Sequence, residues 1–262
     1  PQDAKFQAKN ENQAVYFHKL GTPQSADVLV YATPDRPSLG HSAFVTEDGK
    51  WLVITTTEGT DKRYGIAVLD LTTPGAKPRV LIDKLENEWS YAGNVGSKFF
   101  WNTNKDAPRA RVVTMDVTKG PAIAELIPED TAVLEGAGIV DGQMVASYLV
   151  DVKTEIRRYD LNGKLLGKVA LPGIGTAGFS GDADDAEAFY SFSSYNRPGT
   201  IYRYDMKTGR ATVWAQPKVA FDPGAYVVDQ LFYPSKDGTK IPMFVVKRKD
   251  LKGPAPTLLY AY

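Results

Sequence analysis

Apolar and polar residues alternate along most of this chain, in short runs separated by glycine, aspartate and asparagine. Alternation with a period of two is typical of β-strands that bury one face, and the polar, glycine-rich breaks are typical of turns. None of these runs has the period of an amphipathic helix. The pattern therefore predicts an all-β fold for most of the chain.

The same order of strands and turns recurs four times. Each recurrence contains a short strand-like piece that carries an aspartate and ends at a turn: Asp70, Asp116, Asp160 and Asp205. The steps between them are 46, 44 and 45 residues, a period that suits one four-stranded blade of a β-propeller. We predict four complete blades, in which these aspartates accept backbone hydrogen bonds at the third hairpin rather than bind a ligand.

The repeats are flanked by two segments of different character. Residues 13–32 read as strand, turn, strand, which is half of another blade, so the arc is expected to leave unpaired edges and to be part of a longer chain. After about residue 225 the period stops, and residues 227–249 predict a long hairpin with its turn at Asp237 and Gly238. We therefore predict a propeller segment over 1–225 and the start of a second domain over 226–262.

Charge and composition exclude several classes of function. Thirty-one basic residues balance thirty-one acidic ones, so nucleic acid and anionic membrane surfaces are not expected as partners. The absence of cysteine rules out disulfides, thiolate metal sites and cysteine nucleophiles. No apolar run reaches the length of a spanning helix, so we expect a soluble protein. Its compartment, cytoplasm or periplasm, stays open.

Few residues in the repeats suggest a catalytic or metal-binding role. His18 and His41 are the only histidines, and neither has a serine and a carboxylate in a recognisable pattern, so both are expected to be structural or solvated. An acidic cluster contains Asp182, Asp184, Asp185 and Glu187. It lacks the spacing and the glycine of a calcium-binding loop, and it falls where the other repeats have a turn, so a solvated hairpin tip is favoured. No metal or cofactor is expected.

Aromatic residues are frequent in the repeats and include four tryptophans: Trp51, Trp89, Trp101 and Trp214. In a propeller such side chains mostly fill the space between neighbouring blades. We therefore expect all four to pack in the core.

One stretch carries a specific resemblance. The sequence YPSKDGTKIPMFVV (233–246), followed by Gly-Pro, Pro and LLYAY (258–262), resembles the junction between propeller and hydrolase domain in the prolyl oligopeptidases. Upstream pieces are also similar to that family, including FHKLGTPQSADVLVYATPDRP, ITTTEG and SFSSYNRPGTIYRYD. The resemblance covers nearly the whole chain after residue 12.

The resemblance implies a seven-bladed propeller that caps an α/β-hydrolase domain and restricts access to its active site. The implied activity is that of a serine endopeptidase hydrolysing short peptides on the carboxyl side of proline. In the family the catalytic serine, aspartate and histidine lie on the hydrolase domain, and this chain has no G-x-S-x-G motif. The implied partners are proline-containing peptides and the rest of the same enzyme, and the chain alone is expected to be inactive.

The resemblance also assigns one site residue. The tyrosine that ends the matching strand of the family donates a hydrogen bond in the oxyanion hole, and its position here is Tyr262. Two departures affect the substrate pocket: Ala261 stands where familiar members have glycine, and Thr57 stands where they have an arginine near the outer subsites. The substrate-binding residues stay unassigned.

Two other readings remain open at this point. One is the related oligopeptidase that cleaves after basic residues and shares the same architecture. The other is a non-enzymatic propeller that binds a partner and uses the C-terminal hairpin to seal its ring.

Overall fold

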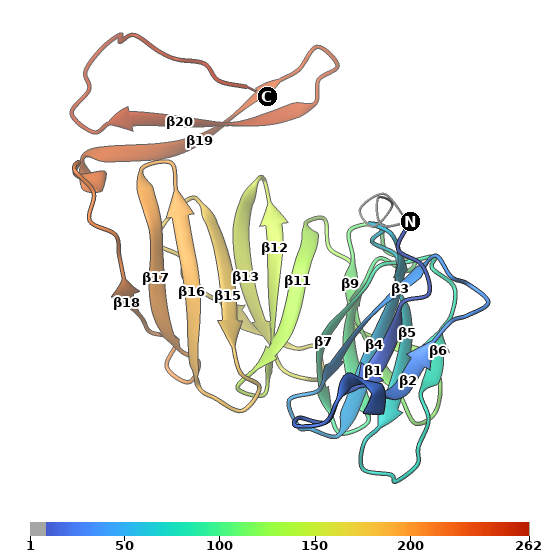
Figure 1. The fold of residues 1–262 in the computed structure, drawn as a ribbon. Helices are drawn as coiled ribbons and strands as arrows, with labels where there is room; N and C mark the ends of the chain where they lie inside the picture. Colours follow the sequence, from blue (N-terminus) through green and yellow to red (C-terminus); the bar gives the residue numbers. More distant parts are fainter. Residues whose placement is uncertain (1–8, 262) are drawn as a thin grey trace. The chain divides into compact units, whose positions relative to one another are not determined.

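A computed structural model describes residues 9–261 of the chain (Figure 1). They form two compact units. The first extends through Thr131 and includes Gly136–Gly138, and the second contains Ala132–Glu135 and the chain from Ile139 onward. All of the long elements are strands, so the prediction of an all-β fold is confirmed for the described residues.

The first unit contains a two-stranded hairpin and two four-stranded sheets. The hairpin pairs β1 (Ala14–Phe17) with β2 (Val28–Ala32), and a 3-10 turn at Gln24–Ala26 lies between them. The first sheet contains β3 (Leu39–Val45), β4 (Trp51–Glu58), β5 (Gly65–Asp70) and β6 (Arg79–Ile82). The second contains β7 (Trp89–Val95), β8 (Lys98–Thr103), β9 (Arg111–Asp116) and β10 (Ile123–Ile127).

The second unit contains two more sheets of the same kind and a final hairpin. One sheet contains β11 (Val133–Val140, of which Gly136–Gly138 belong to the first unit), β12 (Gln143–Val150), β13 (Lys153–Tyr159) and β14 (Leu165–Lys168). The other contains β15 (Thr176–Gly181), β16 (Glu187–Ser194), β17 (Arg197–Asp205) and β18 (Ala211–Ala215). A 3-10 turn at Pro223–Ala225 leads into the hairpin of β19 (Tyr226–Pro234) and β20 (Lys240–Arg248).

In all four sheets each strand pairs with the next one in sequence. This is the strand order of the predicted blades, and the predicted turns fall between the strands. Gly49 and Gly96 have φ of 69° and 60°, values that a glycine adopts without steric cost. Burial alternates along the strands, most clearly in β17, where every second side chain is buried, as a half-buried strand requires.

The core of the first unit lies between its two four-stranded sheets. Trp51 of β4 meets Phe99 of β8 edge to face, with ring centroids 5.8 Å apart, and Trp89 meets Trp101 in the same way at 6.4 Å. Valine, isoleucine and methionine side chains from both sheets complete the cluster. Packing in the core is thus confirmed for these three tryptophans.

The core of the second unit lies between its own two four-stranded sheets and is rich in tyrosine. The rings of Tyr190 and Tyr202 stack with centroids 4.8 Å apart, and Tyr204 is also buried. The prediction for the fourth tryptophan is wrong, because Trp214 is 62% exposed. It lies on β18, the last strand of its sheet, all of whose residues are exposed, and its ring meets that of Phe189 with centroids 5.6 Å apart.

The four repeated aspartates cap the turns between the third and fourth strands, as predicted. In each case Oδ1 accepts a hydrogen bond from the backbone N–H two residues later. The donors are Thr72 for Asp70 (2.8 Å), Thr118 for Asp116 (3.1 Å), Asn162 for Asp160 (2.9 Å) and Lys207 for Asp205 (2.9 Å). These are Asx turns, so the periodic aspartates serve the fold.

Acid should weaken these turns. The pKa of each of the four carboxyls is lowered from its usual 3.8, chiefly by the Thr72 hydroxyl at Asp70 and by the Lys164 N–H at Asp160. Because the folded state lowers these pKa values, their stabilisation is present above about pH 4 and is lost as the pH falls through the folded values. We expect the urea midpoint to fall between pH 5 and pH 2, and replacing all four by asparagine to flatten that fall. Asparagine retains the oxygen acceptor and does not titrate. Asp184→Asn in an exposed turn is the control, and an equal flattening by that variant would contradict the assignment.

Candidate functional site

The residue assigned to the oxyanion hole, Tyr262, lies outside the described residues. The described residues that precede it, from Leu251 to Ala261, form no strand, although the resemblance implies a strand over 258–262. Leu258, Leu259 and Tyr260 are all largely exposed.

The hairpin that leads to this segment is well defined. Nine residue pairs join β19 to β20, from Tyr226 with Arg248 to Pro234 with Lys240. At the predicted turn, Asp237 accepts hydrogen bonds from the Ser235 hydroxyl and, at 3.0 Å, from the Thr239 N–H. These contacts lower the pKa of Asp237 to about 2. Several large apolar side chains of the hairpin are about half exposed: Leu231, Phe232, Tyr233 and Val246.

Thr57, which stands where family members have an arginine near the outer substrate subsites, makes a local hydrogen bond. It lies near the end of β4, and its hydroxyl donates to the Asp61 carbonyl at 2.8 Å. Asp61 in turn binds Arg63, and this contact lowers its pKa to about 2. Thr57 therefore helps to order the β4–β5 connection.

Both histidines have structural partners, as predicted. His18 Nδ1 lies 2.6 Å from Asp27 Oδ1 across the β1–β2 hairpin. His41 lies between the hydroxyls of Thr33 and Thr56, at 3.1 and 2.9 Å, and burial lowers its pKa. Neither imidazole contacts a serine in these hydrogen bonds, so neither has the arrangement of a general base in a triad.

The acidic cluster lies in the turn between β15 and β16, as the register of the repeats predicted. Asp182, Asp184 and Asp185 are exposed, and Asp185 Oδ1 accepts the Glu187 N–H at 2.8 Å. Within residues 9–261, no three histidine, aspartate or glutamate side chains are grouped closely enough to hold a metal ion.

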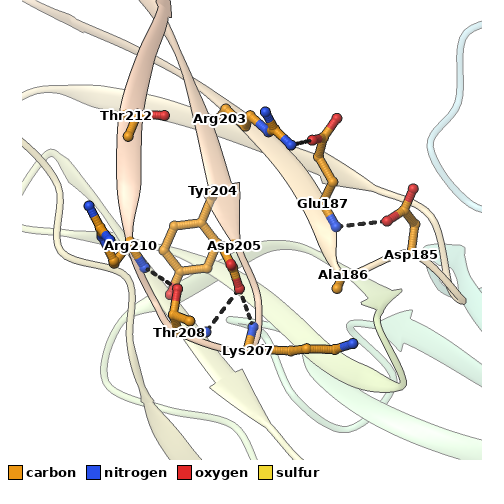
Figure 2. Close-up of a pocket in the computed structure, with 10 residues that line it drawn as sticks. All are labelled: Asp185, Ala186, Glu187, Arg203, Tyr204, Asp205, Lys207, Thr208, Arg210 and Thr212. Carbon is orange, nitrogen blue, oxygen red and sulfur yellow. Dashed lines mark hydrogen bonds and ion pairs between the residues drawn. The ribbon is translucent and has the colours of Figure 1, made fainter.

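A pocket of about 740 Å³ lies where the turns β15–β16 and β17–β18 meet (Figure 2). Six charged side chains line it, three of each sign: Asp185, Glu187, Asp205, Arg203, Lys207 and Arg210. Two of the carboxylates already have partners, since Glu187 pairs with Arg203 and Asp205 accepts hydrogen bonds from two backbone N–H groups. The lining holds no serine, cysteine or histidine, so it lacks the pair of a serine or cysteine nucleophile with a histidine base.

The contacts that join the final hairpin to the sheets of its unit were not predicted from the sequence. Gln230 of β19 binds both Lys153 and the Asp151 carbonyl in the β12–β13 turn. One local signal could have drawn attention to this turn. Asp151 and Val152 form a two-residue loop without glycine, where Asp141 and Gly142 fill the equivalent loop before β12.

No helix within residues 9–261 is long and apolar enough to cross a membrane.

Comparisons with known proteins agree on one family. Residues 1–217 match the family described as prolyl oligopeptidase, N-terminal beta-propeller domain. The prolyl endopeptidase of Elizabethkingia meningoseptica is 37% identical over 257 residues, which cover 96% of this chain and 36% of that protein. Prolyl oligopeptidase A of Galerina marginata is 35% identical over 259 residues, which cover 95% of this chain and 35% of that protein.

Solved structures show the same relationship. One comes from a structural and mechanistic analysis of two prolyl endopeptidases that concerns inter-domain dynamics. It has a TM-score of 0.87 and 43% identity, covering 94% of this chain and 37% of that one. Prolyl oligopeptidase B of Galerina marginata, solved with a 35-residue substrate, has a TM-score of 0.80 and 33% identity, covering 92% and 35%. This chain spans about a third of the length of these relatives. On the sequence match and these structural similarities, the chain belongs to the prolyl oligopeptidase family, and its residues 1–217 correspond to the β-propeller domain of that family.

Proposed function

We propose that this chain is part of a serine endopeptidase that hydrolyses short peptides on the carboxyl side of proline. The observation that carries the proposal is the match over almost the whole chain to proteins named prolyl endopeptidase, at 37% and 36% identity. Relatives bound to peptide substrates support the class of ligand. We call the longer protein that contains this chain the parent protein.

In this proposal residues 1–225 belong to a seven-bladed propeller and residues 226–262 begin the α/β-hydrolase domain. The exposed apolar side chains of the β19–β20 hairpin support the division, because a patch of this kind is normally covered by another part of a protein. The catalytic serine, aspartate and histidine would lie in the portion of the relatives that this chain does not span. Tyr262 would supply one hydrogen-bond donor to the oxyanion hole, and the propeller would restrict entry to small peptides.

Hydrolysis of two chromogenic peptides by the parent protein tests the proposal. One reporter has proline before the leaving group and the other has arginine. We expect the proline reporter to be cleaved with the higher kcat/KM, and we expect the isolated 262-residue chain to cleave neither. Preference for arginine would identify the oligopeptidase that cleaves after basic residues. Absence of both activities in the parent protein would favour a non-enzymatic binding module.

A further inference from the structure

One glutamine with two partners joins the final hairpin to the β12–β13 turn of its unit. Gln230 Oε1 accepts a hydrogen bond from Lys153 Nζ at 2.6 Å, and Gln230 Nε2 donates to the Asp151 carbonyl at 2.5 Å. Lysine can only donate and a carbonyl can only accept, so these partners permit a single orientation of the carboxamide. The side chain therefore matches this turn in both position and polarity.

The turn that Gln230 recognises is strained. Asp151 and Val152 have φ of 48° and 63°, and they join Val150 to Lys153 as a two-residue loop. Such a loop requires positive φ at both positions and normally carries glycine at the second. In the same sheet the loop before β12 does so, with φ of 47° at Asp141 and 65° at Gly142. A β-branched residue at positive φ is a genuine outlier, and such strain persists where the surroundings require it.

Val152 is 55% exposed and lies beside the hairpin's pocket. It lines a pocket of about 260 Å³ together with Phe244 of β20 and Tyr195 of the β16–β17 turn. The rings of Tyr195 and Phe244 lie 5.3 Å apart at an angle of 41°. The strained residue thus contributes an apolar wall at the junction of the hairpin and the sheets, a role that glycine could not fill.

A second polar contact lies on the neighbouring sheet. Asn196 Nδ2, in the β16–β17 turn, donates to the carbonyls of Pro223 and Tyr226 at 3.3 and 3.2 Å. Pro223 and Tyr226 lie at the beginning of the hairpin. There the Lys249 N–H, just after β20, donates to the Ala225 carbonyl at 2.9 Å. The hairpin is therefore attached at two turns, by hydrogen bonds and one aromatic pair around an open pocket. Contacts of this kind exchange readily with water, and small polar interfaces permit movement between domains.

We propose that Gln230 is a positioning residue, which with Asp151, Val152 and Lys153 forms a releasable clamp between the propeller and the domain that begins at the hairpin. This inference rests on the proposed function, because the consequence of release is entry of peptides to the active site. The clamp holds a closed state, and its loss shifts the population toward an open one.

The population of the open state is measured in the parent protein with two nitroxide labels. Lys164→Cys places one label in the β13–β14 turn, and Lys236→Cys places the other in the β19–β20 turn, both at exposed positions. We expect Gln230→Leu and Lys153→Met each to raise the population of long label-to-label distances about three- to tenfold, the effect of losing one or two hydrogen bonds. The double variant should add little, because both changes break one clamp.

The matched control is Lys207→Met, which removes an exposed lysine from the β17–β18 turn of the same unit. It should leave the distances unchanged. Gln230→Glu retains an acceptor for Lys153 and loses the donor to Asp151, so its distances should fall between those of the parent protein and of Gln230→Leu. Unchanged distances in Gln230→Leu and Lys153→Met, or an equal shift in Lys207→Met, would overturn the clamp.

Cleavage tests the consequence separately. In Gln230→Leu we expect kcat/KM for a 35-residue peptide, the length bound to a relative, to rise about threefold or more relative to a short proline reporter. If the distances shift while the parent protein cleaves no proline peptide, the clamp stands and the proposed function fails. If the parent protein cleaves proline peptides and the distances do not respond, the function stands and the clamp fails.

Discussion

Replacing Trp101 by alanine is expected to destabilise the first unit by about 3–5 kcal/mol, the range for removing a large buried aromatic side chain. Trp101 is 0% exposed and lies on β8, in the middle of its sheet. Its ring contacts Tyr91, Phe99 and Trp89, with centroids between 5.7 and 6.4 Å away. The space left by the indole cannot close without moving strands of two sheets, so most of the lost contact energy is not recovered.

Urea denaturation of the 262-residue chain, followed by circular dichroism, measures the effect. Trp214→Ala is the matched control, because the same substitution at a side chain that is 62% exposed should cost less than about 1 kcal/mol. Trp101→Phe should cost clearly less than Trp101→Ala, since it retains a ring and removes an indole N–H that has no hydrogen-bond partner among residues 9–261. Equal losses for Trp101→Ala and Trp214→Ala would contradict the assignment of the core.

Replacing Tyr262 by phenylalanine in the parent protein is expected to lower kcat for a proline reporter by about 10²- to 10³-fold, or about 3–4 kcal/mol of barrier. The change removes one hydroxyl and retains the ring. A donor aimed at the oxyanion acts on the charge that develops in the transition state, so KM should change little. Steady-state kinetics on the short reporter separate the two parameters.

Tyr260→Phe is the control for this prediction. Tyr260 precedes Tyr262 by two residues in the same apolar segment, and the resemblance gives its hydroxyl no part in the reaction. We expect its kcat to stay within about threefold of the parent protein's, as for a hydroxyl remote from the reacting atoms. Loss of activity in both variants to the same extent, or a rise in KM alone for Tyr262→Phe, would contradict the assignment of Tyr262 to the oxyanion hole.

The strands and turns of this protein could be read from the amino-acid sequence because their causes are local. Alternation of apolar residues marks each strand, and the glycine or aspartate that permits a turn lies within a few residues of the hydrogen bonds it makes. The capping contacts of Asp70 and Asp160 each span two residues, so their period of about 45 residues was visible as a pattern. The turn of the final hairpin at Asp237 and Gly238 was visible for the same reason.

Contacts between sheets required the folded chain. Gln230 meets the Asp151 carbonyl 79 residues away in the sequence, and nothing near either residue indicates the other, because loops that lie far apart in the chain meet only after the sheets have packed. The exposure of Trp214 has the same origin, since alternation shows that a strand has an apolar face and does not show whether another sheet covers it. Sequence pattern thus accounts for the secondary structure and its repeat, while side-chain burial and the attachment of the hairpin depend on which surfaces the fold brings together.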